Sequence, residues 1–124
     1  MTNANLPVAN CVLVLEDEPI LRMLAMEIVE DAGFVGIEAA TAEEAINILE
    51  SRNDIFVVFA DVNIPGTLDG LALANAIRDR WPPVEIIITS GQTRPQQRDL
   101  PARAVFIPKP YQVSKLTQTL RDFL

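Results

Sequence analysis

Histidine is absent from this chain, and cysteine occurs once, at Cys11. Without an imidazole, a Ser-His-Asp triad and a histidine-based zinc site are both excluded. A single cysteine cannot form an internal disulfide, which is typical of a protein in a reducing compartment. Because Cys11 opens an apolar run, we expect a buried and unreactive thiol.

Long apolar stretches and positive charge are also scarce. No run approaches the ~20 apolar residues that a membrane helix needs, and residues 1–10 lack the positive charge of a signal peptide. We therefore expect a cytoplasmic protein that does not contact a membrane. The net charge of −7 argues against direct binding of nucleic acid, which requires a basic face, and suits a cation or a basic partner.

Short apolar runs alternate with segments of helical periodicity. This alternation predicts one α/β domain over residues 11–124, a doubly wound parallel sheet with right-handed crossovers, preceded by a flexible tail at 1–10. Strands are predicted at 11–16, 34–39, 55–60, 84–89 and 104–107. Helices are predicted over 17–31, from the cap Thr41 onward, over 70–81 and over 112–124.

The first helix has clear start signals. Asp17 is the expected N-cap, and Pro19 suits the first helical turn. Helical spacing predicts a buried face made of Ile20, Leu24, Ile28 and Val29.

The segment between the fourth and fifth strands is different. Residues 92–103 are mostly polar and contain Pro95 and Pro101. Proline fits only the first turn of a helix and disfavours helix in the residue before it, so about one and a half turns fit between Pro95 and Leu100. We expect a short or irregular fourth helix.

Polar side chains stand where the apolar runs end. Glu16 and Asp17 follow the first run, and Asp61 follows the third. Thr89 ends the fourth run, and Lys109 comes just after the fifth. Because the carboxyl ends of parallel strands meet at one edge of the sheet, where ligands bind, we expect these side chains to converge.

Three of these residues are acids and only one is basic. Two carboxylates about 5 Å apart repel by roughly 3 kcal/mol at an effective dielectric of about 20. With Lys109 included, Glu16, Asp17 and Asp61 leave a charge of about −2, which a divalent cation would cancel. Oxygen ligands favour Mg²⁺ or Mn²⁺ over zinc or copper, and magnesium completes its shell with water and phosphate. The pattern predicts a cation placed to receive a phosphoryl group.

Each residue also has a plainer interpretation. Asp17 can serve only as a helix cap, Glu16 as a solvated acid at a strand end, and Asp61 as an ordinary loop residue. Thr89 can be a strand residue with a satisfied hydroxyl, and Lys109 a surface lysine. Only their joint arrangement at successive strand ends points to a site.

These residues and their spacing resemble the receiver domain of two-component response regulators, over about residues 10–124. The resemblance implies a flavodoxin-like fold with strand order 2-1-3-4-5. It is carried by Val12-Leu13-Val14-Leu15-Glu16-Asp17-Glu18-Pro19, by Asp61 with Pro65 and Asp69-Gly70, by Thr89-Ser90-Gly91 and by Lys109-Pro110.

The resemblance implies a role for each residue of the predicted site. Asp61 would be the phosphoacceptor, phosphorylated by a sensor histidine kinase or a histidine phosphotransfer protein. Asp17 and Asp61 would bind Mg²⁺ directly, Glu16 would act mainly through water, and the backbone carbonyl of Asn63 would complete the protein ligands. Lys109 would bind the phosphoryl oxygens and balance their charge.

A conformational switch is implied as well. The Thr89 hydroxyl would contact the bound phosphoryl group, and Phe106 would turn inward when Thr89 moves. A strained or cis Lys109–Pro110 bond is also expected by resemblance.

Three features depart from the usual family pattern. The loop after Asp61 carries one extra residue before Asp69-Gly70. Ser90 stands where alanine or glycine is more usual, which narrows access to Asp61. The proline-bearing segment 92–103 makes an atypical output surface the expectation.

The expected function is a phosphorylation-controlled signalling module, not an enzyme, that signals by a conformational switch or relays the phosphate. Because the chain ends at Leu124, directly after the last predicted helix, we expect a stand-alone receiver whose downstream partner the sequence does not name. Family members often pair through the side formed by the fourth and fifth helices, so a homodimer is compatible.

Three alternatives differ in their chemistry. A magnesium-dependent aspartyl-phosphate phosphatase usually has a general acid at the position of Asn63, which cannot act as one. A flavodoxin-like carrier needs a phosphate loop after the first strand, where Glu16-Asp17-Glu18 would repel phosphate. A receiver that is never phosphorylated is disfavoured because Asp17, Asp61, Thr89 and Lys109 are all present.

Overall fold

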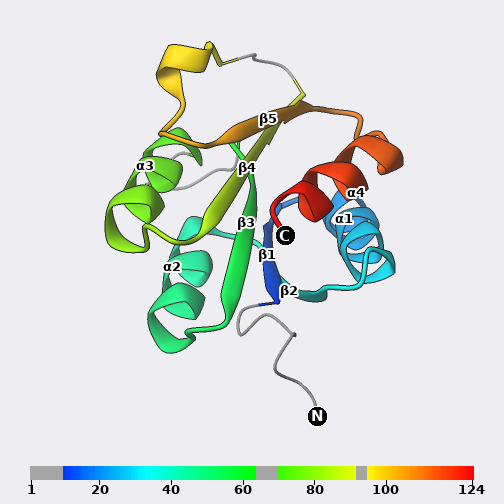
Figure 1. Ribbon diagram of the computed structural model, residues 1–124, viewed down its shortest axis with the longest axis horizontal. Helices are drawn as coiled ribbons and strands as arrows, with labels where there is room; N and C mark the ends of the chain where they lie inside the picture. The colour runs from blue at the N-terminus through cyan, green and yellow to red at the C-terminus, as the bar shows by residue number, and fades with distance from the viewer. Residues whose placement is uncertain (1–9, 64–69, 92–94) are drawn as a thin grey trace.

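The computed structural model describes residues 10–63, 70–91 and 95–124. Five parallel strands form one sheet in the order β2-β1-β3-β4-β5, which confirms the predicted topology (Figure 1). The strands are β1 (Cys11–Leu15), β2 (Val35–Ala39), β3 (Ile55–Asp61), β4 (Glu85–Ser90) and β5 (Val105–Pro108). The helices are α1 (Pro19–Asp31), α2 (Ala42–Ser51), α3 (Gly70–Arg80) and α4 (Val113–Asp122).

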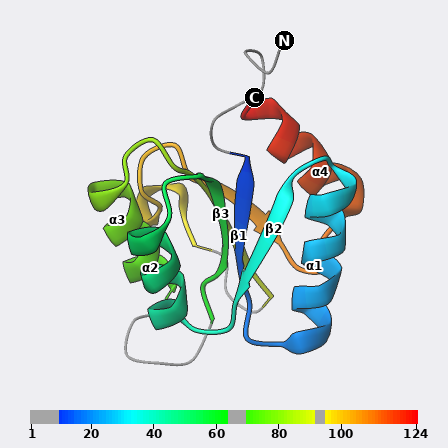
Figure 2. The ribbon, with the colours of Figure 1, turned by 90° about the horizontal axis from the view of Figure 1, so that it is seen from below.

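Helices cover both faces of the sheet. Figure 2 shows α1 and α4 on one side and α2 and α3 on the other. Because strand side chains alternate between faces, Leu13 and Leu15 join the core on the α2–α3 side, whereas Val12 and Val14 join the core on the α1–α4 side. Burial on both faces is the physical reason that these strands appear in the sequence as continuous apolar runs.

The helix starts agree only in part with the N-caps predicted from the sequence. Helix α1 begins at Pro19, so its N-cap is Glu18, and the prediction of Asp17 as the cap is wrong. The Glu18 side chain makes no capping hydrogen bond. Thr41 caps α2 as predicted, because its hydroxyl accepts a hydrogen bond from the Glu44 N–H at 3.1 Å.

The predicted inward face of α1 is also partly wrong. Its buried residues are Ala25, Ile28 and Val29. Ile20 and Leu24 remain 76% and 37% exposed, respectively. The small Ala25 side chain lets the helix approach the sheet closely, so the helix is rotated toward that residue and away from the longer aliphatic side chains of its first turns.

The segment between β4 and β5 forms little helix, as predicted. Its described residues contain one short 3₁₀ helix, η2 (Gln97–Asp99), so the label α4 belongs to the next helix along the chain. The Arg78 side chain of α3 donates hydrogen bonds to the carbonyls of Ala102, Pro82 and Val84 at 2.8, 2.8 and 2.9 Å. These bonds anchor the end of the segment to α3 and to the start of β4.

The strand register sets the site at the carboxyl edge of the sheet. Strand β3 extends to Asp61, and the residues that follow β1 and β5 reach the same edge. The aligned pairs at this edge are Leu15 with Ala60, Asp61 with Thr89, and Ser90 with Pro108.

The predicted tail, except Asn10, and the loop residues Pro65 to Asp69 lie outside the described residues. Cys11 is buried, as predicted. No helix in the described ranges is both long and apolar enough to cross a membrane.

Candidate functional site

Three acids meet at the carboxyl edge of the sheet. Glu16 and Asp17 follow β1, and Asp61 ends β3. One carboxylate oxygen from each of the three lies within 4.8 Å of the others. Glu16 and Asp61 are buried, whereas Asp17 is exposed at the mouth of a cleft of about 340 Å³ that all three line. The predicted convergence of these side chains is therefore present.

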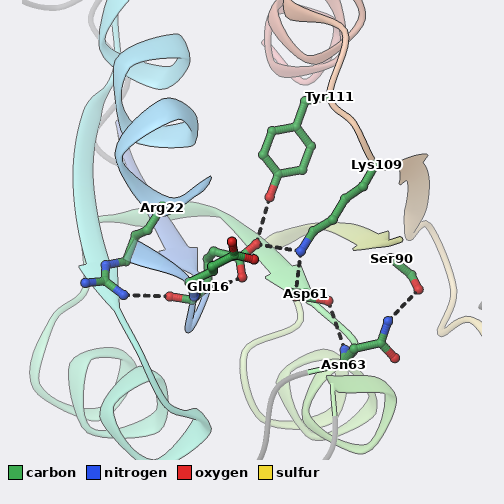
Figure 3. Close-up of polar contacts among 8 residues, drawn as sticks. Glu16, Arg22, Asp61, Asn63, Ser90, Lys109 and Tyr111 are labelled. Carbon is green, nitrogen blue, oxygen red and sulfur yellow. Dashed lines mark hydrogen bonds and ion pairs between the residues drawn. The ribbon is translucent and has the colours of Figure 1, made fainter. Parts of the chain in front are cut away.

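Lys109 reaches the acids from the end of β5. Its Nζ lies 2.8 Å from Glu16 Oε1 and 2.8 Å from Asp61 Oδ2 (Figure 3). Burial alone would lower the pKa of Lys109, but the hydrogen bonds to Asp61 and Glu16 outweigh burial and raise this pKa above its ordinary value. The Lys109–Pro110 peptide bond is cis, as expected.

The remaining lone pairs of the acids suit a hard cation. Asp61 Oδ1 accepts a hydrogen bond from the Asn63 N–H at 2.9 Å, and Glu16 Oε2 accepts one from the Glu18 N–H at 3.2 Å. With Lys109 included, the three carboxylates still carry about two negative charges in excess. The donor set consists of oxygen and opens to solvent, so these residues fit a divalent ion that keeps part of its water shell.

Two contacts to Glu16 were not predicted. The Tyr111 hydroxyl donates a buried hydrogen bond to Glu16 Oε1 at 2.9 Å, and Arg22 Nη1 donates to the Glu16 carbonyl at 2.9 Å (Figure 3). Burial, followed by the nearby charge of Glu16, raises the pKa of Tyr111. The position of Tyr111, two residues after Lys109, was the available signal, because it belongs to the same strand-end link.

The predicted switch residues lie on two neighbouring strands, Thr89 on β4 and Phe106 on β5. Thr89 is 1% exposed, and its Oγ1 has no hydrogen-bond partner among the described residues. A buried hydroxyl without a partner is costly, and this one belongs to the residue aligned with Asp61 on the neighbouring strand. Phe106 is half-buried and packs against the core on the α2–α3 side.

Ser90 contacts the loop that follows Asp61. It is buried, and its Oγ accepts a hydrogen bond from Asn63 Nδ2 at 2.8 Å (Figure 3). The Asn63 side chain is therefore tied to β4, while its N–H bonds the Asp61 carboxylate. The serine that departs from the family pattern thus helps to fix the loop beside Asp61.

Helix α3 begins against the backbone that carries Asp61. A Cβ atom at Gly70 would lie 2.7 Å from the Asp61 carbonyl oxygen and would overlap Val62 Cα. The Gly70 N–H donates to the Val62 carbonyl at 3.4 Å. Only glycine allows this approach, so α3 supports the end of β3 directly.

A larger cleft, of about 490 Å³, lies at the opposite end of the sheet and is lined in part by Phe56 and Trp81. The charged groups of its lining are already paired: Arg52 with Asp54, and Glu50 with Arg80. The smaller acidic cleft instead brings together three carboxylates and Lys109, whose pKa is raised by its acidic partners. Chemistry is expected where such groups converge.

The model of the response regulator receiver domain family matches residues 12–121. The chain belongs to this family. The sensor kinase CckA of Brucella abortus (strain 2308) is 33% identical to this receiver over 117 residues, which are 91% of the chain and 12% of that protein. The receiver thus spans a small part of that relative.

Solved receiver structures superimpose over most of the chain. The receiver domain of NtrX from Brucella abortus is 29% identical, with a TM-score of 0.81, covering 91% of this chain and 97% of that one. A response regulator receiver protein from Sinorhizobium medicae WSM419 has a TM-score of 0.85 at 24% identity, covering 93% and 94%. These likenesses confirm the predicted receiver fold. The family match supports the predicted class of phosphorylation-dependent signalling module.

Proposed function

We propose that Asp61 accepts a phosphoryl group from a phosphohistidine, with Mg²⁺ bound beside it, and that the phosphorylated domain signals to another protein. The observation that carries this proposal is the cluster of Glu16, Asp17 and Asp61, two of them buried, with Lys109 Nζ 2.8 Å from two of the carboxylates. Crowding these carboxylates costs free energy, and such clusters in a cleft mark candidate functional sites.

The transfer forms one bond and breaks another. An Asp61 carboxylate oxygen attacks phosphorus, and the bond from phosphorus to the donor's histidine nitrogen breaks. Lys109 can turn from the carboxylates to the phosphoryl oxygens. The Thr89 hydroxyl can donate a hydrogen bond to a phosphoryl oxygen. The Asn63 N–H keeps Asp61 Oδ1 in place. These groups position the phosphoryl group and neutralise its charge, which is most of what phosphoryl transfer requires.

Glu16, Asp17, Asp61 and the Asn63 carbonyl would hold the cation. When bound, Mg²⁺ offsets the negative charge of the phosphoryl oxygens and of the carboxylates. Mn²⁺ has similar ligand preferences and could replace it. Because the attacking and charge-balancing groups all belong to this chain, a small phosphodonor should be sufficient for self-phosphorylation.

The donor we propose is a sensor histidine kinase or a histidine phosphotransfer protein. A kinase relative, CckA, supports this class because its matching segment is similar along 91% of this chain. The output would follow from movement of Thr89 toward the phosphoryl group and an inward turn of Phe106, or from relay of the phosphate. A homodimer remains a compatible form of the output.

The test is phosphorylation by acetyl phosphate, followed by intact-protein mass spectrometry. Wild type should gain one phosphoryl group in Mg²⁺ and none after chelation. Asp61→Asn should gain none, whereas Asp79→Asn, which removes an exposed acid of α3, should be labelled like wild type. Labelling of Asp61→Asn at the wild-type rate would refute the proposal.

A further inference from the structure

We propose that Tyr111 is a positioning residue of the cation site, whose hydroxyl holds the Glu16 carboxylate so that one of its oxygens stays available to the ion. This inference rests on the proposed function, because it assigns a residue to the same site. The Tyr111 hydroxyl donates its hydrogen bond to Glu16, so Tyr111 acts through that carboxylate (Figure 3).

Packing holds the Tyr111 ring in place independently of its hydroxyl. It lies in the link between β5 and α4 and is 8% exposed. It packs edge-on against Phe59, with ring centroids 5.2 Å apart. A phenylalanine would fill this space without burying a polar atom, so packing does not account for the hydroxyl.

The hydrogen bonds of Glu16 show which oxygen is left for an ion. Each carboxylate oxygen has about two acceptor sites. Oε1 accepts from the Tyr111 hydroxyl at 2.9 Å and from Lys109 Nζ at 2.8 Å, so both of its sites are used. Among the described residues, Oε2 accepts only from the Glu18 N–H, at 3.2 Å. A free lone pair therefore remains on Oε2.

The role of Tyr111 becomes larger when Lys109 moves. Lys109 bonds both Glu16 and Asp61 here, and in the proposed transfer it turns to the phosphoryl oxygens. Glu16 Oε1 then retains only the Tyr111 hydroxyl as a side-chain partner among the described residues. Tyr111 would keep the carboxylate oriented through that step, as outer partners of metal ligands do in other sites.

Calorimetric titration with Mg²⁺ tests this inference. Tyr111→Phe keeps the ring and should weaken Mg²⁺ binding about 10-fold, the lower end of the range for such outer partners. The matched control is Thr119→Val, which removes another buried hydroxyl, bonded to the Lys115 carbonyl at 2.8 Å on α4. This control should bind Mg²⁺ like wild type.

A double-mutant cycle separates positioning from a general structural effect. If Tyr111 acts through Glu16, then Tyr111→Phe should have no further effect in a Glu16→Gln background. Losses that simply add would overturn the inference, and so would wild-type affinity in Tyr111→Phe.

The unmodified protein offers an independent readout. Tyr111 is the only tyrosine of the chain, so a ¹³C label on the tyrosine ring gives one resonance for the hydroxyl-bearing carbon. The chemical shift of that resonance should change as Mg²⁺ is added and should saturate at the same Mg²⁺ concentration as the calorimetric signal. A chemical shift that does not change with Mg²⁺ would overturn the inference.

Failure of the proposed function would look different. If wild type neither binds Mg²⁺ nor takes a phosphoryl group at Asp61, both proposals fall. If wild type is phosphorylated at Asp61 but Tyr111→Phe binds Mg²⁺ equally well, only the role of Tyr111 is refuted.

Discussion

Removing the charge of Lys109 should destabilise the metal-free protein. Its Nζ is 2.8 Å from both Glu16 Oε1 and Asp61 Oδ2, and its side chain is 16% exposed. Removing one partner of a buried ion pair leaves uncompensated charge and costs about 3–5 kcal/mol. Because water reaches part of this lysine, we expect Lys109→Met to lower the free energy of unfolding by about 3 kcal/mol, the lower end of that range.

Urea unfolding with a chelator measures this loss. Lys115→Met is the matched control, because Lys115 is exposed on α4 and the same change should cost no more than about 0.5 kcal/mol. Mg²⁺ at 100 times its dissociation constant adds about 2.7 kcal/mol to the stability of a protein that binds it only when folded. A fixed Mg²⁺ concentration should stabilise Lys109→Met more than wild type, since its site is more negative. A loss no larger than that of Lys115→Met, or a smaller response to Mg²⁺, would refute the reasoning.

Two further predictions concern backbone packing and pH. Gly70→Ala places a Cβ 2.7 Å from the Asp61 carbonyl oxygen. Urea unfolding should therefore show a free energy of unfolding about 1–3 kcal/mol lower, and labelling of the variant by acetyl phosphate should be slower than that of wild type. An unchanged stability and labelling rate would contradict the close approach. Burial raises the pKa of Tyr111, and the carboxylate partners of Lys109 raise its pKa despite burial. The folded protein therefore binds the protons of Tyr111 and Lys109 more tightly than the unfolded chain does. The stability that results is fully present below the pKa values of the unfolded chain, near 10, and is lost as the pH rises further. In the presence of a chelator, the free energy of unfolding should fall above about pH 10, and it should fall less steeply in Tyr111→Phe than in wild type. If the two plots of stability against pH are parallel, Tyr111 makes no such contribution.

The strands were predictable because the sheet is covered on both faces. Val12 and Leu13 point to opposite layers, yet both are fully buried, so the sequence shows an unbroken apolar run. The same runs located Glu16 and Asp61, because the first polar residue after a buried strand marks the edge of the sheet. The strand order came from the family resemblance.

The orientation of α1 was less accessible to sequence reasoning. Spacing favoured Ile20 and Leu24, whereas the sheet accepts the small Ala25. Several faces of this helix are apolar enough to be buried, and contact with the sheet and with α4 decides among them. Periodicity alone does not contain that information.

The sequence places Tyr111 two residues after Lys109, but the link that holds it has no periodicity to show which group its hydroxyl contacts. Its hydroxyl meets Glu16 only after β5 and β1 are placed in one sheet, 95 residues apart in the chain. Thr89 was predicted as a site residue from its position. Only the structure shows that its hydroxyl has no hydrogen-bond partner among the described residues.

The most direct test of the account is to locate the phosphoryl group. After incubation with acetyl phosphate and Mg²⁺, peptide mass spectrometry should find the modification on Asp61. The site prediction would be contradicted by a phosphoryl group on any other residue, or by a wild-type protein that stays unmodified while its fold and Mg²⁺ binding are intact.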